Sequence, residues 1–127
     1  MRARPGNIIF LLTVLLLAGS TALAQHLVED IRDPEQHFLY AAGLMQREFY
    51  DLAQPQLQQF LERYPEHTRA REVHKLLVHC CHAQKKTAET LAAIENFRRK
   101  WPEDPLNEQL LTIKAAIYFA QKDYPTA

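Results

Sequence analysis

Apolar residues recur every three or four positions along most of the chain, which is the period of an amphipathic α-helix. Five segments show this period, and their apolar faces are Phe38, Ala41, Ala42 and Met45; Ala53, Leu57, Phe60, Leu61 and Tyr64; Ala70, Val73, Leu77, Cys80 and Cys81; Leu91, Ile94 and Phe97; and Leu106, Leu110, Ile113, Ile117 and Ala120. We find neither the alternating pattern of a β-strand nor a hairpin turn signal. The pattern therefore predicts an all-α protein.

Aspartate and threonine residues mark where these helices begin. Asp33-Pro34 is expected to open the first helix and Asp104-Pro105 the fifth, because aspartate accepts hydrogen bonds from free backbone amides and proline has no amide to leave unpaired. Thr68 is the expected N-cap of the third helix.

Proline residues mark where helices end. Pro65 and Pro102 are expected to stop the second and fourth helices, since the residue before a proline avoids the helical backbone conformation. Pro55 falls inside the second helix, where an interior proline costs about 3 kcal/mol. Either this helix begins near Gln54, or the proline lies on its exposed side.

The chain matches itself when it is shifted by 37 residues. Tyr64-Pro65-Glu66 then falls on Trp101-Pro102-Glu103, and Ala83-Gln84-Lys85 falls on the identical Ala120-Gln121-Lys122. Leu57 and Phe60 likewise correspond to Ile94 and Phe97. A fixed period of this length indicates stacked two-helix units rather than one closed core.

These signals divide the chain into a leader and one repeat domain. After a short lead at residues 25–33, we predict an α-solenoid of antiparallel helix pairs over residues 34–127. It has about two and a half repeats, at 34–66, 67–103 and an incomplete 104–127. The last repeat has a first helix without a second, so we expect either a longer reading frame, which we favour, or a partner that covers this helix.

Residues 1–24 are predicted to be a signal peptide. Arg2 and Arg4 form a basic start, residues 8–17 are apolar apart from one threonine, and Ala22-Leu23-Ala24 is a small-x-small cleavage site. The apolar segment has about half the ~20 residues that a membrane-spanning helix needs. We therefore expect cleavage and export, rather than an uncleaved membrane anchor or an integral membrane protein.

The charges are balanced. The chain has 15 Lys and Arg residues against 15 Asp and Glu residues, and its formal net charge is zero. This balance gives no support to nucleic acid or an anionic membrane surface as a partner.

One segment carries a family pattern: Tyr50-Asp51-x-Ala53-x-x-x-Leu57-x-x-Phe60-Leu61-x-x-Tyr64-Pro65-x-His67-x-x-Ala70. It resembles a tetratricopeptide repeat, and is most similar to the bacterial subgroup found in the outer-membrane assembly lipoprotein BamD and the Tol-Pal coordinator YbgF. The resemblance implies that Ala53 lets two helices approach closely, that Leu57 and Phe60 fill the space between them, and that Pro65 ends the unit. The repeat positions that follow from it are Ala41, Ala53, Leu57, Phe60, Pro65, Val78, Ile94, Phe97 and Pro102.

The chain also departs from the pattern. Thr87 and Thr90 stand where the second unit should have Tyr and Ala. The residue directly after the expected cleavage site is Gln25 and not a cysteine, which puts a lipid anchor in doubt.

The resemblance implies a non-catalytic scaffold that binds proteins or peptides in the periplasm or at the outer membrane. Outer-membrane assembly, Tol-Pal and peptidoglycan-related machinery are the expected settings; the alternative is the N-terminal binding module of a larger periplasmic enzyme or sensor. In this family the first helix of each pair lines a concave face. The candidate partner-binding residues on these helices are Tyr40, Arg47, His74, His79 and Tyr118. The sequence leaves the oligomeric state open.

One cluster could carry metal or thiol chemistry. It consists of His79-Cys80-Cys81-His82, with His74 upstream. The C-x-x-C spacing of paired zinc ligands is absent, and both cysteines lie on the predicted apolar face, where a free cysteine acts as a small hydrophobe. Adjacent cysteines are also too close for an ordinary disulfide. We therefore predict no metal, no cofactor and no catalytic residue.

Overall fold

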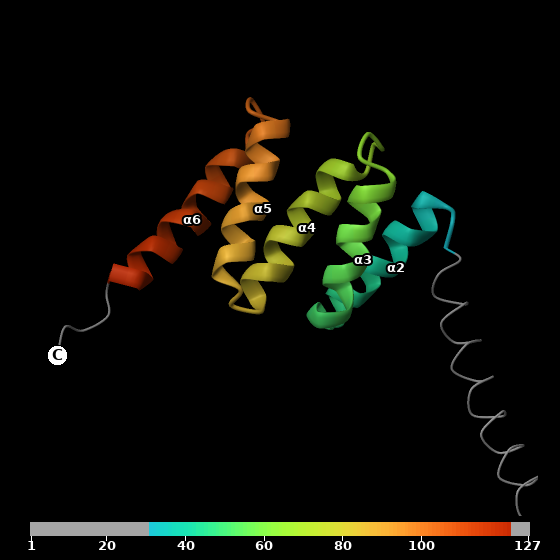
Figure 1. Ribbon diagram of the computed structural model, residues 1–127, viewed down its shortest axis with the longest axis horizontal. Coiled ribbons are helices and arrows are strands. Elements are labelled where there is room, and N and C mark those ends of the chain that lie inside the picture. The colour runs from blue at the N-terminus through green and yellow to red at the C-terminus, as the bar shows by residue number, and fades with distance from the viewer. Residues whose placement is uncertain (1–30, 123–127) are drawn as a thin grey trace, which may run out of the picture. The chain divides into compact units, whose positions relative to one another are not determined.

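The computed structural model describes residues 31–122, and within that range it contains helices and no strand (Figure 1). The helices are α2 (Pro34–Gln46), α3 (Tyr50–Arg63), α4 (Ala70–Ala83), α5 (Thr87–Lys100) and α6 (Leu106–Lys122). They fall on the five predicted segments, so the all-α fold class is confirmed. The predicted signal peptide and the last residues of the third repeat lie outside the described residues.

Each helix packs against the next one along the chain, and α2 also touches α4. Within residues 31–122, the backbones of α3 and α5 do not come close to each other, and neither do those of α4 and α6. Contacts are thus limited to near neighbours, as expected for a solenoid rather than a closed bundle. Of the consecutive pairs, α5 and α6 contact each other least.

Small and large apolar side chains alternate in the core. Ala41 and Ala53 are fully buried and let α2 and α3 approach, while Leu57 and Phe60 fill the space beside them. A second cluster joins α4, α5 and α6 through Val78, Ala93, Ile94, Phe97, Leu106 and Leu110. Leu77 packs against both clusters, so the two repeats share a continuous apolar interior.

Matching turns end α2 and α4. Glu48 and Lys85, which are 37 positions apart, both adopt a left-handed backbone with φ of 60° and 58°. In each turn the left-handed residue donates its amide hydrogen three residues back and the following residue donates five back, as in a Schellman motif. The 37-residue repeat is therefore also present in the backbone conformation of these turns.

Pro55 lies inside α3, which begins at Tyr50, and its side chain is exposed. Of the two predicted alternatives, the exposed-side placement is the correct one. Buried Ala53 and Leu57, on either side of the proline, hold the helix against its neighbours.

Two other expectations about caps have different outcomes. Thr68 is not an N-cap: α4 begins at Ala70, and the amide of Arg69 instead donates to Nδ1 of His67 at 3.1 Å. Asp104 does cap α6, since its Oδ1 accepts the amide hydrogen of Leu106 at 2.9 Å.

The predicted apolar faces are corrected at one position. Ala120 is exposed, because nothing in the described part of the chain covers that end of α6, whereas the other predicted face residues are buried or half-buried. None of the described helices combines the length and the apolar character needed to cross a bilayer.

Candidate functional site

A groove runs along α4 between α3 and α5. It encloses about 480 Å³ and is lined by Gln58, Leu61 and Glu62 of α3, His74 and Leu77 of α4, and Ala93 and Asn96 of α5. Because the backbones of α3 and α5 stay apart, α4 forms the floor between them. Leucine and alanine side chains make the lining of the groove apolar, while amide and carboxylate groups stand at its rim.

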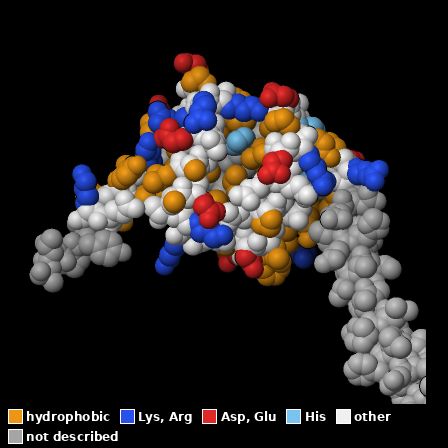
Figure 2. Space-filling model, in the orientation of Figure 1, with side chains coloured by type: hydrophobic (Ala, Val, Ile, Leu, Met, Phe, Trp, Pro, Cys, Tyr) orange, Lys and Arg blue, Asp and Glu red, His pale blue; other side chains and the backbone are white. Residues whose placement is uncertain are grey.

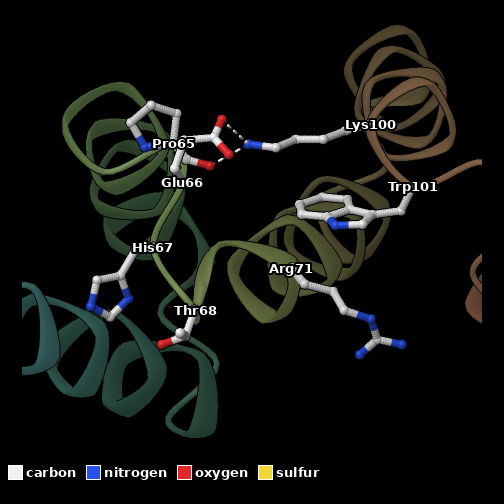
Figure 3. Close-up of a pocket in the computed structure, with 7 residues that line it drawn as sticks. All are labelled: Pro65, Glu66, His67, Thr68, Arg71, Lys100 and Trp101. Carbon is white, nitrogen blue, oxygen red and sulfur yellow. Dashed lines mark hydrogen bonds and ion pairs between the residues drawn. The ribbon is translucent and has the colours of Figure 1, made fainter.

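A second hollow, of about 280 Å³, lies at the N-terminal end of α4. Figure 3 shows Trp101 and Arg71 on one side and Pro65, His67 and Thr68 on the other. Arg71, His74 and Leu77 follow one another at three-residue intervals along α4. The second hollow therefore continues the direction of the groove.

His74 lies where the groove and the second hollow approach each other. Its ring packs edge-on against Trp101, with centroids 5.2 Å apart, and against Phe97 at 6.5 Å. Its Nδ1 is buried without a hydrogen-bond partner. Burial, together with the smaller effect of the positive charge of Lys100, lowers the pKa of His74 to about 4. The ring is therefore neutral at pH 7 and acts as part of an aromatic wall.

Lys100 ties the end of α5 to the α3–α4 turn. Its Nζ donates to the carbonyl oxygen of Pro65 and, at 3.2 Å, to Oε1 of Glu66, as Figure 3 shows. The same ammonium group lies 5.2 Å from the centre of the Trp101 ring. The positive charge of Lys100 is thus already paired within the protein. The second hollow therefore offers a ligand the indole ring of Trp101 rather than a free ammonium group.

A polar cluster joins the opposite end of α3 to the α4–α5 turn. Buried Gln54 accepts hydrogen bonds from Gln84 at 2.9 Å and Lys86 at 2.7 Å, and it donates to Glu89. Cys80 donates from Sγ to the carbonyl oxygen of Tyr50 at 3.1 Å. These bonds satisfy polar groups that packing removes from water, so the cluster has a structural role.

The thiols are unsuited to nucleophilic or metal chemistry as they stand. Burial raises the pKa of Cys80 to about 11 and also raises the pKa of Cys81. Since the thiolate is the reactive and ligating form, both side chains are in the inert state. Within residues 31–122, no group of three or more His, Cys, Asp and Glu side chains is placed to hold a metal ion.

The five residues predicted to bind partners do not form one site. Tyr40, His79 and Tyr118 are exposed on three different helices, Arg47 is exposed in the turn after α2, and only His74 of the five lines the groove. His74 is also half-buried, which corrects its expected outward position, because Phe97 and Trp101 pack against it.

The sequence predicts little of the groove, for a physical reason. The groove lies between the second helices of two successive pairs, with a first helix as its floor, whereas the sequence predicts partner-binding residues on first helices. Trp101 corresponds to Tyr64 in the 37-residue repeat. That correspondence does not predict its contact with His74, which depends on how α4 and α5 cross.

A family model matches most of the chain. It is that of the YfiO family, described as an outer membrane lipoprotein, and the match covers residues 32–126. It thus includes every described helix and both hollows. No individual curated protein matches the chain.

Proposed function

Because the chain belongs to the YfiO family of outer membrane lipoproteins, we propose that it is a non-catalytic scaffold that binds protein partners in the bacterial cell envelope. The observation that carries this proposal is the open groove between α3 and α5. Stacked helix pairs of this kind expose long surfaces on which a partner segment can lie.

The lining of the groove indicates which kind of segment fits. Leu61, Leu77 and Ala93 give the groove an apolar lining. The volume of the groove, about 480 Å³, falls within the ~300–1,000 Å³ of typical ligand sites. The amide groups of Gln58 and Asn96 on opposite walls can each donate and accept hydrogen bonds, as a peptide backbone requires. We therefore expect a peptide segment that inserts an apolar side chain between two polar walls.

The resemblance to tetratricopeptide proteins of the envelope suggests the partner system. Outer-membrane assembly agrees best with the family description, and Tol-Pal and peptidoglycan-related machinery are the alternatives. The experiment that identifies the partner also distinguishes these settings.

Photo-crosslinking in the periplasm tests the groove directly. A photoreactive residue replaces Gln58 or Asn96, both of which are exposed on groove walls, or Gln36, an exposed residue of α2 outside the groove. We expect one envelope protein to be cross-linked from both groove positions and not from Gln36.

A blocking variant completes this experiment. Asn96→Arg places a long charged side chain at the groove wall and should abolish the cross-link from Gln58, while Gln36→Arg should leave it intact. Equal cross-linking from all three positions, or a cross-link that survives Asn96→Arg, would contradict the proposal.

A further inference from the structure

The outer face of α6 carries apolar side chains that nothing in residues 31–122 covers. Leu111, Tyr118 and Phe119 are 41%, 46% and 69% exposed, and Ala115 between them is exposed as well. Figure 2 shows hydrophobic side chains exposed along this helix, on the left of the view. At 100° per residue, this stripe lies opposite the residues that α6 buries, which are Leu106, Leu110 and Ile117. An exposed apolar stripe of this kind marks an interaction surface.

Apart from Tyr118, whose symmetry-related position is the polar Thr112, the stripe is symmetric about Ala115. Leu111 stands four residues before it and Phe119 four residues after it. Glu108 stands seven residues before it and Lys122 seven after it, on the same side of the helix. The stripe is therefore apolar in the middle, with the acidic Glu108 at its N-terminal end and the basic Lys122 at its C-terminal end.

We propose that α6 pairs with α6 of a second copy of the chain, antiparallel and across a two-fold axis at Ala115. Such an interface uses the same patch on both subunits, so each contact occurs twice. Glu108 then faces Lys122 of the second copy, and Leu111 faces Phe119 of the second copy. The two Ala115 side chains meet at the axis, where their small size lets the helices approach closely.

The charges explain why the partner is a second copy. Glu108 and Lys122 are exposed, and neither forms an ion pair in the described part of the chain. An antiparallel copy presents the opposite charge to each of them, and the opposed helix dipoles favour the same orientation. The inference does not depend on the groove, because α6 does not line it.

Sedimentation equilibrium of the exported chain, purified from the periplasm over a range of concentrations, tests the pairing. We expect a reversible dimer. Glu108→Lys and Lys122→Glu each turn two attractive contacts into repulsive ones, and each should weaken the dimer by about tenfold or more. The double variant E108K/K122E reverses both charges and should restore the dissociation constant.

The design separates pairing from folding. Both reversed charges oppose the dipole of α6, so recovery in the double variant cannot come from a more stable helix. Gln109→Lys, an exposed change on α6 outside the stripe, should leave the dimer unchanged, and Ala115→Arg should abolish it while circular dichroism stays constant. A chain that remains monomeric at every concentration, or a dimer that is equally stable in Glu108→Lys, overturns the proposal.

Discussion

Arg71 donates two hydrogen bonds to the carboxylate of Asp104, with donor–acceptor distances of 2.5 and 2.8 Å. The pair joins the first turn of α4 to the turn before α6, although the backbones of the two helices do not come close to each other within residues 31–122. Asp104 also caps α6. One side chain therefore fixes where the third repeat begins relative to the second.

Replacing Asp104 should make the stability of the fold less sensitive to low pH. The hydrogen bonds from Arg71 and from the Leu106 amide lower the pKa of Asp104 from 3.8 to about 2. Its contribution to stability is present above pH 4 and disappears as the pH falls toward 2, when the folded carboxylate is protonated. Asparagine can still cap α6 but cannot pair with the charge of Arg71. We therefore expect Asp104→Asn to lower the melting temperature at pH 7 by about 3 °C and to remove this part of the acid sensitivity. Glu103→Gln, a neighbouring exposed change, should do neither.

His74 should make the fold sensitive to mild acid. Its pKa is about 4 when the chain is folded and 6.5 in the reference state, so the folded state favours the neutral ring. The stabilisation is complete above pH 6.5 and falls progressively between pH 6.5 and 4. His74→Phe keeps an aromatic ring against Trp101 and cannot titrate, so its melting temperature should fall less than that of the wild type over this interval. Burial also lowers the pKa values of His37 and His79, which account for the decline that remains. An equal decline in wild type and variant would show that another group is responsible.

The two cysteines should be unreactive in the folded protein. With a pKa of about 11, Cys80 has almost no thiolate at pH 8, and Cys81 is shifted in the same direction. We expect a thiol-reactive dye to label neither residue in native buffer and both in strong denaturant. Rapid labelling of the native chain would contradict this prediction and would support a reactive thiol at Cys80 or Cys81.

The left-handed turn at Glu48 should gain stability from glycine. A residue with a side chain is strained at a φ of 60°, whereas glycine is not. Glu48→Gly should therefore raise the free energy of unfolding by about 1 kcal/mol. Arg47→Gly, one residue earlier and without a positive φ, should give no gain in urea unfolding. A stability loss at both positions would contradict the assignment of strain.

The sequence predicts the fold well because the fold depends on local signals. The apolar period places Leu57 and Phe60 in the core, and Pro65 and Pro102 follow the ends of α3 and α5. Asp104 caps its helix because the cap lies two residues from its target. Each of these features is decided within a few residues.

The candidate site is predicted poorly because it depends on distances between helices. His74 meets Trp101 only because α4 and α5 cross at a particular angle, and residue spacing along the chain does not encode that angle. The prediction that Thr68 is the N-cap of α4 is wrong for a related reason. The ring of His67 accepts the nearby amide of Arg69, a competing contact that the sequence pattern does not reveal.

The turns at Glu48 and Lys85 have a consequence for the length of the molecule. Because both place their hydrogen bonds identically, the segment between them carries a complete set of joints. We expect that cutting that segment out, or inserting a duplicate at the same junction, preserves the backbone geometry of the turn where the pieces join. The chain should therefore tolerate changes of length in whole modules at this connection.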